Sequence, residues 1–407
     1  MHILLIHQAF AAIDEPGGTR HHEFARYLAG KGHRVTVIAS PVSYLTGDNT
    51  SHANVSQSSQ LVSGGDVTIL RAYTYQGLHK SFFHRVLAFF SFMVSSFFIG
   101  LRVRHVDLIW GTSPPIFQGW TAWMLARLKR VPFLFEVRDL WPEFAIAIGV
   151  LRNPTLINMT LWLERFLYRH ADKVIVNSPG FIDHVAGRGA RSVELIPNGA
   201  DPEMFDPADG GDLFREAHHF QGKFVALYAG AHGMSNDLDV VLEAAKMLIA
   251  KPEIQIVFLG DGKEKARLQA QANEMGLENV TFLPPVAKSG MAGVLAGTDT
   301  CIAILKPLDA YKTTYPNKVF DYMAAGRPVV LAIDGVIREV VEAAGCGIYC
   351  PPGDARAVAQ AIKTLAGDPV RSREMGLAGC RYLKENFSRA AIAGKLLELL
   401  EGMVKSY

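Results

Sequence analysis

Two β-branched apolar runs, KFVALYAG at residues 223–230 and IQIVFLG at residues 254–260, flank the segment NDLDVVLEAAKML (236–248), whose apolar residues have helical spacing. Short apolar runs of this kind predict buried strands. A strand, a helix and a second strand in succession predict two parallel strands joined by a covering helix. This part of the chain is therefore predicted to have an α/β fold.

The same alternation extends along most of the 407 residues in two sets. In the first set, strands are predicted at 2–7, 34–39, 66–70, 107–110, 132–137, 173–177 and 192–196. In the second set, they are predicted at 223–230, 254–260, 279–283, 299–305, 327–332 and 347–350. Two sets of this length predict two doubly wound, Rossmann-like domains.

The boundary between these domains is predicted in IPNGADPEMFDPADGGD (196–212), where Pro, Gly, Asn and Asp interrupt the pattern. The domains are expected at 1–200 and 201–385, followed by a C-terminal helix at 386–407 with apolar periodicity. The polar segment 46–65 is expected to be a mobile loop beside the first sheet.

Composition excludes several classes of protein. The chain is 49% hydrophobic and 20% charged, unlike a disordered protein, and its net charge of +2 argues against a nucleic-acid partner. Four cysteines and an N-terminus without the pattern of a signal peptide predict a cytoplasmic protein with reduced thiols. P-loop, His-Glu-x-x-His and Gly-x-Ser-x-Gly motifs are missing from the sequence, which argues against the ATPase, zinc protease and serine hydrolase classes.

Two segments suit a bound diphosphate. Gly17 and Gly18 precede a predicted helix, whose first amides and dipole attract anions. In YPNKVFDYMAAGRPVV (315–330), Lys318 lies at a helix start, and Asp321 lies where its carboxylate can accept the two hydroxyls of a ribose. An ordinary turn, and an ordinary loop, helix and strand, remain the alternatives for these two segments. A complete Gly-x-Gly-x-x-Gly is absent, because GDGKEK (260–265) has a lysine at the third glycine position, and this disfavours a nicotinamide-dependent dehydrogenase.

Several of these motifs occur in the order found in retaining glycosyltransferases of family 4, which the chain resembles over nearly its whole length. GGTRHHEFARYLAGKGHRVTVI, LIPNGADPEMF, FDYMAAGRPVV and GCGIYCPPGDARAVAQAI resemble successive motifs of that family. FEVRDLWPE and the Pro-x-Lys form of the third motif are closer to transferases of amino sugars and fucosamine in bacterial surface polysaccharide synthesis. The resemblance implies the GT-B architecture, with two Rossmann-like domains facing a cleft and a C-terminal helix that crosses back to the first domain.

The resemblance also implies a nucleotide-sugar donor and a set of site residues. The implied donor-binding residues are Gly17, Gly18, Gly233, Asp261, Gly262, Val286, Asn317, Lys318 and Asp321. Asp321 stands where the family holds the ribose, and Gly233 matches a glycine at the donor phosphate. Asp261, Gly262 and Val286 lie where the family contacts the base. The implied catalytic and orienting residues are Lys318, Arg138 and Asp139, the last two near the sugar or the acceptor.

The chain departs from the family pattern at two places. Thr313 stands where the family has the first Glu of its Glu-x7-Glu motif, and AGAHGMSNDLD offers no cation after its strand. Lys318 is the candidate replacement for that positive charge. Catalysis of this type rests on stabilising the departing diphosphate, so no metal or other cofactor is expected.

The leading hypothesis is transfer of a sugar, with retention, from a nucleoside diphosphate donor, expected to be UDP-linked, to a lipid-linked or polysaccharide acceptor. Two alternatives stay open at this point. The same architecture is found in hexosamine 2-epimerases, and the loss of the first Glu is compatible with a non-catalytic subunit that binds a nucleotide sugar.

A cluster of phenylalanines bears on where the enzyme works. The segment VLAFFSFMVSSFFIGL (86–101) carries no charge, and its sixteen residues fall short of the roughly 20 that a membrane-spanning helix needs. Lys80, Arg85, Arg102 and Arg104 bracket it. Residues 80–104 are therefore expected either to form a core helix or to contact the inner face of the cytoplasmic membrane peripherally.

Overall fold

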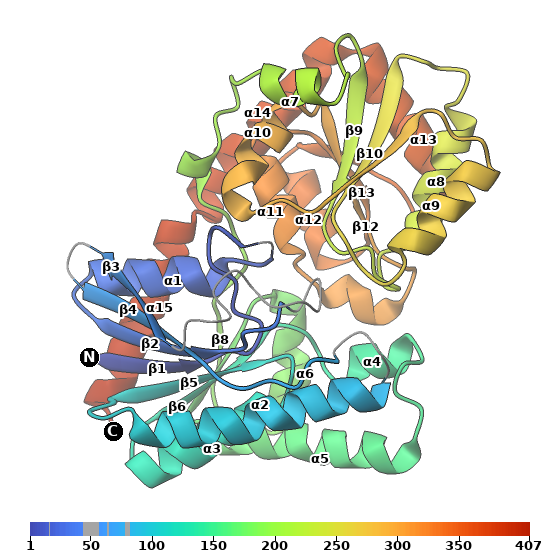
Figure 1. Cartoon of the computed structure of the whole chain (residues 1–407). Coiled ribbons are helices and arrows are strands. Elements are labelled where there is room, and N and C mark those ends of the chain that lie inside the picture. Colours follow the sequence, from blue (N-terminus) through green and yellow to red (C-terminus); the bar gives the residue numbers. More distant parts are fainter. Residues whose placement is uncertain (16, 44–56, 63–64, 78–81) are drawn as a thin grey trace. The chain divides into compact units, whose positions relative to one another are not determined.

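The computed structural model describes residues 1–15, 17–43, 57–62, 65–77 and 82–407. The chain forms two compact units (Figure 1), each described here by itself. Unit 1 comprises Met1–Pro197 and Ala390–Tyr407, and unit 2 comprises Asn198–Arg389. Each unit contains a sheet with helices on both faces, which is the predicted doubly wound α/β architecture.

Within the described residues, unit 1 holds an eight-stranded sheet in the order β3-β4-β2-β1-β5-β6-β7-β8. Its strands are β1 (His2–Ile6), β2 (Arg34–Ala39), β3 (Gln57–Val62), β4 (Gly65–Arg71), β5 (Leu108–Ser113), β6 (Phe133–Val137), β7 (Lys173–Val176) and β8 (Val193–Leu195). All neighbours pair in parallel except β3, which runs antiparallel to β4 at the edge of the sheet.

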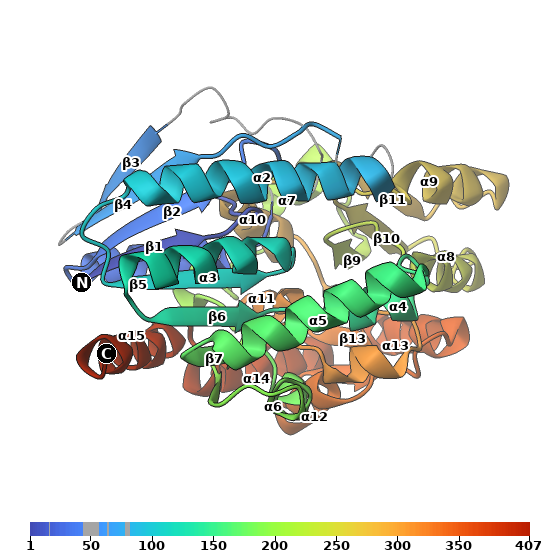
Figure 2. The same cartoon turned by 90° about the horizontal axis from the view of Figure 1, so that it is seen from below.

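Two layers of helices cover the sheet of unit 1. The helices are α1 (Arg20–Gly30), α2 (Phe82–Arg102), α3 (Phe117–Lys129), α4 (Glu143–Ala147), α5 (Pro154–His170), α6 (Ile182–Gly187) and α15 (Arg389–Lys405). Side chains of α1 and α15 pack on one face, and those of α2, α3 and α5 pack on the other. Figure 2 shows α2, α3 and α5 side by side over the sheet. Successive residues of β1 alternate between the two cores, as a buried parallel strand requires.

Unit 2 holds a parallel sheet, whose described strands follow the order β11-β10-β9-β12-β13-β14. The strands are β9 (Phe224–Ala229), β10 (Ile254–Leu259), β11 (Val280–Leu283), β12 (Thr300–Ile304), β13 (Val329–Ala332) and β14 (Gly347–Tyr349). The helices are α7 (Asp212–Ala217), α8 (Leu238–Met247), α9 (Lys265–Glu274), α10 (Met291–Ala296), α11 (Asn317–Ala324), α12 (Val336–Ala343), α13 (Ala355–Gly367) and α14 (Pro369–Asn386). Side chains of α8, α9 and α13 pack on one face, and those of α10, α11, α12 and α14 on the other.

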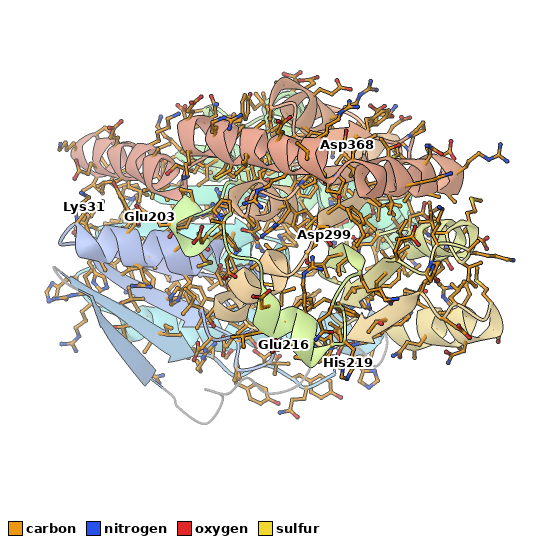
Figure 3. The ribbon with its side chains drawn as sticks, turned by 90° about the horizontal axis from the view of Figure 1, so that it is seen from above. Lys31, Glu203, Glu216, His219, Asp299 and Asp368 are labelled. Atoms are coloured by element: carbon orange, nitrogen blue, oxygen red, sulfur yellow. The ribbon has the colours of Figure 1, made fainter. Side chains whose placement is uncertain are left out.

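Carboxylate side chains hold several segments of unit 2 in place. Two of these side chains, Asp299 and Asp368, are labelled in Figure 3. Asp299 accepts hydrogen bonds from the Arg215 guanidinium at 2.8 Å and from the Val225 amide at 2.7 Å, so it ties α7 to β9. Asp368 accepts a hydrogen bond from the Arg371 amide at 3.0 Å and thereby caps α14.

Two expectations about local structure are corrected. The segment 46–65 is not simply a loop, because Gln57–Val62 forms β3; residues 46–56 and 63–64 lie outside the described part. The apolar helix α2 has 21 residues and extends beyond the sixteen uncharged ones on which its length was judged. Within the described residues, Phe83–Arg102 is the segment long and apolar enough to cross a membrane, by length and composition only.

Candidate functional site

The ammonium group of Lys318 lies at the carboxyl end of β9. Pro316 precedes α11, and Lys318 is the second residue of that helix. Its Nζ lies 3.8 Å from the centre of the Tyr228 ring, and a side chain at Gly230 would place its Cβ 2.8 Å from this Nζ. The first turn of α11 has amides without an intrahelical acceptor, so the cation and the helix dipole act on the same region. This arrangement suits an anionic ligand.

Burial lowers the pKa of Lys318 to about 7. The surrounding protein penalises the charged form, although the tyrosine face partly offsets this penalty. An anion placed against Nζ reverses the balance, because it favours the ammonium. Lys318 therefore takes up a proton readily when an anion binds.

Asp321 lies one turn further along α11 and is ion-paired. The Lys288 Nζ is 2.5 Å from its Oδ1, and the Asn317 amide donates to its Oδ2 at 3.5 Å. Lys288 is buried in a short 3-10 turn, Lys288–Gly290, with its Nζ 5.6 Å from the centre of the Phe205 ring. Sequence reasoning missed Lys288, because a lone lysine after LPPVA has no distinguishing pattern. Lys288 holds the carboxylate in a fixed position while leaving it oxygen lone pairs for hydroxyl donors.

The loop before α11 is fastened to the segment IPNGADPEMF. The Asn198 side-chain amide donates to the Tyr315 carbonyl at 2.7 Å. Arg389 donates to the Asn317 Oδ1 at 3.1 Å and to the carbonyl of Gly199. Asn317 therefore serves to connect Arg389 with Asp321, and these bonds fix the start of α11.

Gly233 and Gly262 in unit 2 differ in how much space surrounds their α-carbons. A Cβ at Gly233 would have only the Asn236 Nδ2 nearby, at 3.5 Å. A Cβ at Gly262 would collide with the backbone of His232 at 2.5 Å, and Gly262 has a φ of +151°. Packing of the protein itself accounts for Gly262, whereas the space beside Gly233 is open to a ligand.

The loop after β10 packs against the loop after β9. Asp261 accepts a hydrogen bond from the His232 amide through its carbonyl, at 2.7 Å, and from the Gly262 amide through Oδ1, also at 2.7 Å. His232 is fully buried, and within the described part of the chain neither of its ring nitrogens has a hydrogen-bond partner. Burial, followed by the charges of Lys265 and Lys318, lowers the pKa of His232 to about 4, so the ring is neutral. Val286 is half-buried on the loop after β11 and packs near Gly290.

Thr313 does not supply the charge of the glutamate that it replaces. It ends a 3-10 turn, Asp309–Thr313, and its hydroxyl donates to the Ala310 carbonyl at 2.7 Å. The side chain therefore contributes to the turn. Lys318, Asn317, Asp321 and the Gly230 loop come together at one end of α11, and Asp261 joins them through the His232 loop.

In unit 1, the glycine loop has an open side. Gly17 has a φ of +146°, which favours glycine, and a Cβ there would lie 3.0 Å from Ala11. A Cβ at Gly18 would have no described heavy atom within 4 Å. Helix α1 begins at Arg20, directly after this loop. The open backbone at Gly18 suits the close approach of an anion.

The first residues of α1 are fixed by a buried carboxylate. Glu136 on β6 accepts from the Arg20 Nε at 3.0 Å and pairs with the His21 Nε2 at 2.6 Å. Burial opposes the charge of Glu136, but His21 and Arg20 hold its pKa below the ordinary value. Arg20 also donates to the carbonyls of Ile196 and Pro197, at 2.6 Å each. His21 thus has a structural role, and His22 is also buried.

Arg138 and Asp139 follow β6 directly. One Arg138 nitrogen donates to the Pro114 carbonyl at 2.9 Å, and its buried Nε has no hydrogen-bond partner among the described residues. Asp139 is exposed to solvent. The two side chains therefore present a cation and a titratable carboxyl group at the end of a central strand.

The described residues contain no group of three or more His, Cys, Asp or Glu side chains able to hold a metal ion. All four cysteines are buried and free.

Comparisons with known proteins identify both units. Residues 17–199 match the family model "Glycosyl transferase 4-like domain", and residues 223–368 match "Glycosyl transferases group 1". The colanic acid biosynthesis glycosyl transferase WcaI of Escherichia coli is 26% identical over 325 residues, covering 77% of this chain and 78% of WcaI. The glycosyltransferase WbjE of Pseudomonas aeruginosa is 23% identical, covering 70% of this chain and 72% of WbjE.

Solved structures share the fold. The sucrose-phosphate synthase of Thermosynechococcus elongatus has a TM-score of 0.80 at 19% identity and covers 100% of both chains. Anabaena HepE, solved in complex with UDP-glucose, has a TM-score of 0.74 at 19% identity, covering 99% of this chain and 100% of HepE. Because each unit matches its own family model and the full length matches GT-B structures, the protein is a glycosyltransferase of the GT-B fold, similar to those of family 4.

Proposed function

We propose that this glycosyltransferase transfers a sugar, with retention, from a UDP-linked donor to a lipid-linked or polysaccharide acceptor in bacterial surface polysaccharide synthesis. The observation that carries the donor proposal is the position of the Lys318 ammonium, beside Gly230 and the start of α11. The complexes of HepE with UDP and UDP-glucose, and the relation to WcaI, support the donor class and the pathway.

The proposed chemistry depends on stabilising the departing nucleoside diphosphate. Lys318 and the amides of α11, with the open backbone at Gly233, neutralise the charge that develops as the bond from sugar to phosphate breaks. One such well-aimed donor contributes about 3 kcal/mol to the transition state. In retention, the acceptor oxygen attacks the face that the diphosphate leaves. The leaving diphosphate is then itself near the acceptor proton, and no metal is required.

The remaining residues bind and orient the substrates. Asp321, fixed by Lys288, accepts the ribose hydroxyls, while Asp261, Gly262 and Val286 contact the base. Gly17 and Gly18, at the start of α1, are the proposed anion-binding glycines of unit 1. Arg138 and Asp139 orient the donor sugar or the acceptor hydroxyl. The resemblance of FEVRDLWPE and the Pro-x-Lys motif to transferases of amino sugars and fucosamine makes N-acetylated UDP-hexosamines the first donors to test.

The proposed place of action is the cytoplasm, at the inner face of the cytoplasmic membrane. UDP-sugars are charged and water-soluble, whereas a lipid-linked acceptor stays in the bilayer. The enzyme therefore has to bring a soluble donor to a membrane-bound hydroxyl.

Product analysis tests this proposal. The purified protein is incubated with a panel of nucleotide sugars, with and without bacterial lipid extract, and the anomeric configuration of the product is determined by NMR. UDP release that depends on the extract, together with an α-linked product from an α-linked donor, is expected. Isomerisation of the donor without an acceptor would instead indicate an epimerase, and binding without any turnover would indicate a non-catalytic subunit.

Two substitutions test the site assignment. Lys318→Ala and Asp321→Ala are expected to reduce kcat/KM by about a hundredfold or more, given the worth of a single charged donor. Lys363→Ala provides the matched control, because Lys363 is an exposed lysine of the same unit on α13. Wild-type kinetics from both site variants would refute the assignment.

A further inference from the structure

Helix α2 presents a continuous apolar stripe to solvent. Its exposed apolar side chains are Phe83, Leu87, Phe90, Val94, Phe98 and Leu101. They recur every three or four residues, so they lie on one side of the helix along its whole length. Phe83 is 66% exposed and Phe98 is 56% exposed. A stripe of this size is unusual on the surface of a soluble protein and indicates a contact with another apolar surface.

The neighbouring helices extend the apolar surface. The ring centres of Phe90 on α2 and Phe117 on α3 are 5.0 Å apart, and those of Trp120 on α3 and Trp162 on α5 are 6.3 Å apart. Further exposed apolar side chains of this layer are Leu128, Leu156, Met159 and Trp162. We call the outer surface of α2, α3 and α5 the three-helix face; Figure 2 views unit 1 from this side.

The charges around the three-helix face are nearly all positive. Segments 82–104, 117–131 and 143–170 contain nine Lys and Arg residues and two acidic residues, Glu143 and Glu164. Glu143, at the start of α4, pairs with His184 at 3.0 Å. Glu164 is buried and pairs with His184 at 3.0 Å and with Arg188 at 2.6 Å, so it contributes no exposed negative charge. The exposed cations are Arg102, Arg104, Arg127, Arg130, Arg152, Arg165 and Arg169. Since the whole chain has a net charge of +2, the rest of the sequence is acidic overall.

The inner side of α2 is fastened to unit 1. The Thr121 hydroxyl donates to the Met93 carbonyl at 2.9 Å, and the Ser95 hydroxyl donates to the Tyr73 carbonyl at 2.6 Å. Phe92 is fully buried, and Gly100 leaves room only for the side chain of Leu125. Insertion of α2 across a bilayer would break these contacts and expose the core beneath. The helix is therefore built to lie in the plane of a surface.

We infer that the three-helix face docks unit 1 on an anionic lipid bilayer, with the α2 stripe and Trp162 inserted at the level of the headgroups and the arginines on the phosphates. Charge complementarity decides the occupant, because an apolar face surrounded mostly by arginines matches an anionic bilayer. A second copy of the same face would bring like charges together. This inference deepens the proposed function, since it rests on an acceptor that is held in a membrane.

The structure also selects the residues for a test. Phe89 is 9% exposed and Phe97 is only partly exposed, so their replacement would disturb the core rather than the docking. Phe83, Phe90 and Phe98 point outward and can be replaced together by Ser. Lys80, which was included in the basic bracket, lies outside the described residues.

Vesicle binding provides the measurement. Full-length protein is titrated with vesicles of phosphatidylethanolamine and about one-third phosphatidylglycerol, and with vesicles of phosphatidylcholine alone. The tryptophan emission of the wild type is expected to shift to the blue with the anionic vesicles, and Trp162→Phe is expected to remove most of this shift. The variant Phe83→Ser/Phe90→Ser/Phe98→Ser is expected to bind at least tenfold more weakly, and Arg102→Glu/Arg104→Glu about fivefold more weakly per cation.

Matched controls come from unit 2. Leu213 is 84% exposed and Val370 is 71% exposed, so Leu213→Ser/Val370→Ser removes exposed apolar area away from the three-helix face. Arg356→Glu/Arg371→Glu reverses two exposed cations there. Both controls are expected to bind vesicles like the wild type. Thermal unfolding and UDP binding, measured for every variant, show that folding and the donor site are intact.

The outcomes separate this inference from the proposed function. Equal vesicle binding by the wild type and the triple Ser variant would overturn the docking, whatever the catalytic result. Failure to extract the protein from bacterial membranes with alkaline carbonate would also overturn it, by showing a spanning helix. So would a dimer that the triple Ser variant dissociates in the absence of lipid. Normal docking without sugar transfer would instead reject the proposed function alone.

Discussion

The affinity for UDP should fall as the pH rises above 7, because the Lys318 ammonium is lost there. Its pKa is about 7 in the free protein. At pH 8, one unit above that value, only about one-tenth of the free protein carries the charge. UDP itself is fully ionised over this range, since the second pKa of a phosphate is about 6. The pH dependence between 7 and 9 therefore reports on the protein.

The size of the effect follows from Coulomb's law. A negative charge 4 Å from Nζ contributes about 4 kcal/mol at an effective dielectric constant of 20, equivalent to a pKa rise of about 3 units. The bound form then titrates near pH 10. Between pH 7 and pH 9, the Kd for UDP is expected to rise by about fiftyfold, with close to one proton taken up per UDP bound.

Isothermal titration calorimetry at pH 8 in two buffers with different ionisation enthalpies measures this proton uptake. Lys318→Arg should abolish both the uptake and the pH dependence, because arginine stays charged over the whole range. The stability of the free protein should change in the opposite direction to its affinity for UDP. Between pH 7 and 10, Lys318 carries a proton in the unfolded chain but not in the folded free protein. The free energy of unfolding therefore rises with pH over this range. A Kd that stays constant from pH 7 to 9, with no proton uptake, would refute this role of Lys318.

Three further predictions concern the same site. Gly18→Ala and Gly233→Ala should fold normally but bind UDP at least tenfold more weakly. The control Gly187→Ala, where the added methyl group also meets open space, should bind UDP normally. Unchanged affinity of both site variants, measured by calorimetry, would show that no phosphate approaches these backbones. Lys288→Met should lower the free energy of unfolding, measured by urea titration, by about 2 kcal/mol, because it leaves the Asp321 carboxylate without its cation. The double variant Lys288→Met/Asp321→Asn should recover part of that loss. Additive losses of the two substitutions would contradict the coupling. Removal of divalent ions with EDTA should leave turnover unchanged, and restoration of lost activity by Mg²⁺ would contradict the metal-free mechanism.

Strand patterns in the sequence predict most of the fold because they arise from burial on both faces of a parallel sheet. The run at 34–39 coincides with β2, and the others differ from the observed strands by one to three residues at their ends. Strand β3 was missed because QSSQLV is polar and lies at a sheet edge, where it pairs with a single neighbouring strand, β4. The ends of α2 carry arginine and histidine residues, so a search for uncharged runs finds only its middle part, residues 86–101.

The site is less predictable than the fold. Lys318 and Asp321 are readable because they lie in one short motif on one helix. Lys288 and Arg389 reach that helix from distant parts of the chain, at sequence separations that no local pattern encodes. At Gly262, the backbone conformation and the packing on His232 already account for a glycine, so its contact with the base stays a prediction.

Helix α15 has a consequence for how the protein is made. Ile392, Leu396 and Leu400 complete the core of unit 1, although they are synthesised after all of unit 2. Unit 2 is one uninterrupted segment, so it can fold on the ribosome while unit 1 still lacks part of its core. Unit 1 is the later of the two to become stable, even though its first strand leaves the ribosome first. A fragment ending at residue 197 should therefore aggregate, and α15 supplied as a separate peptide should rescue it.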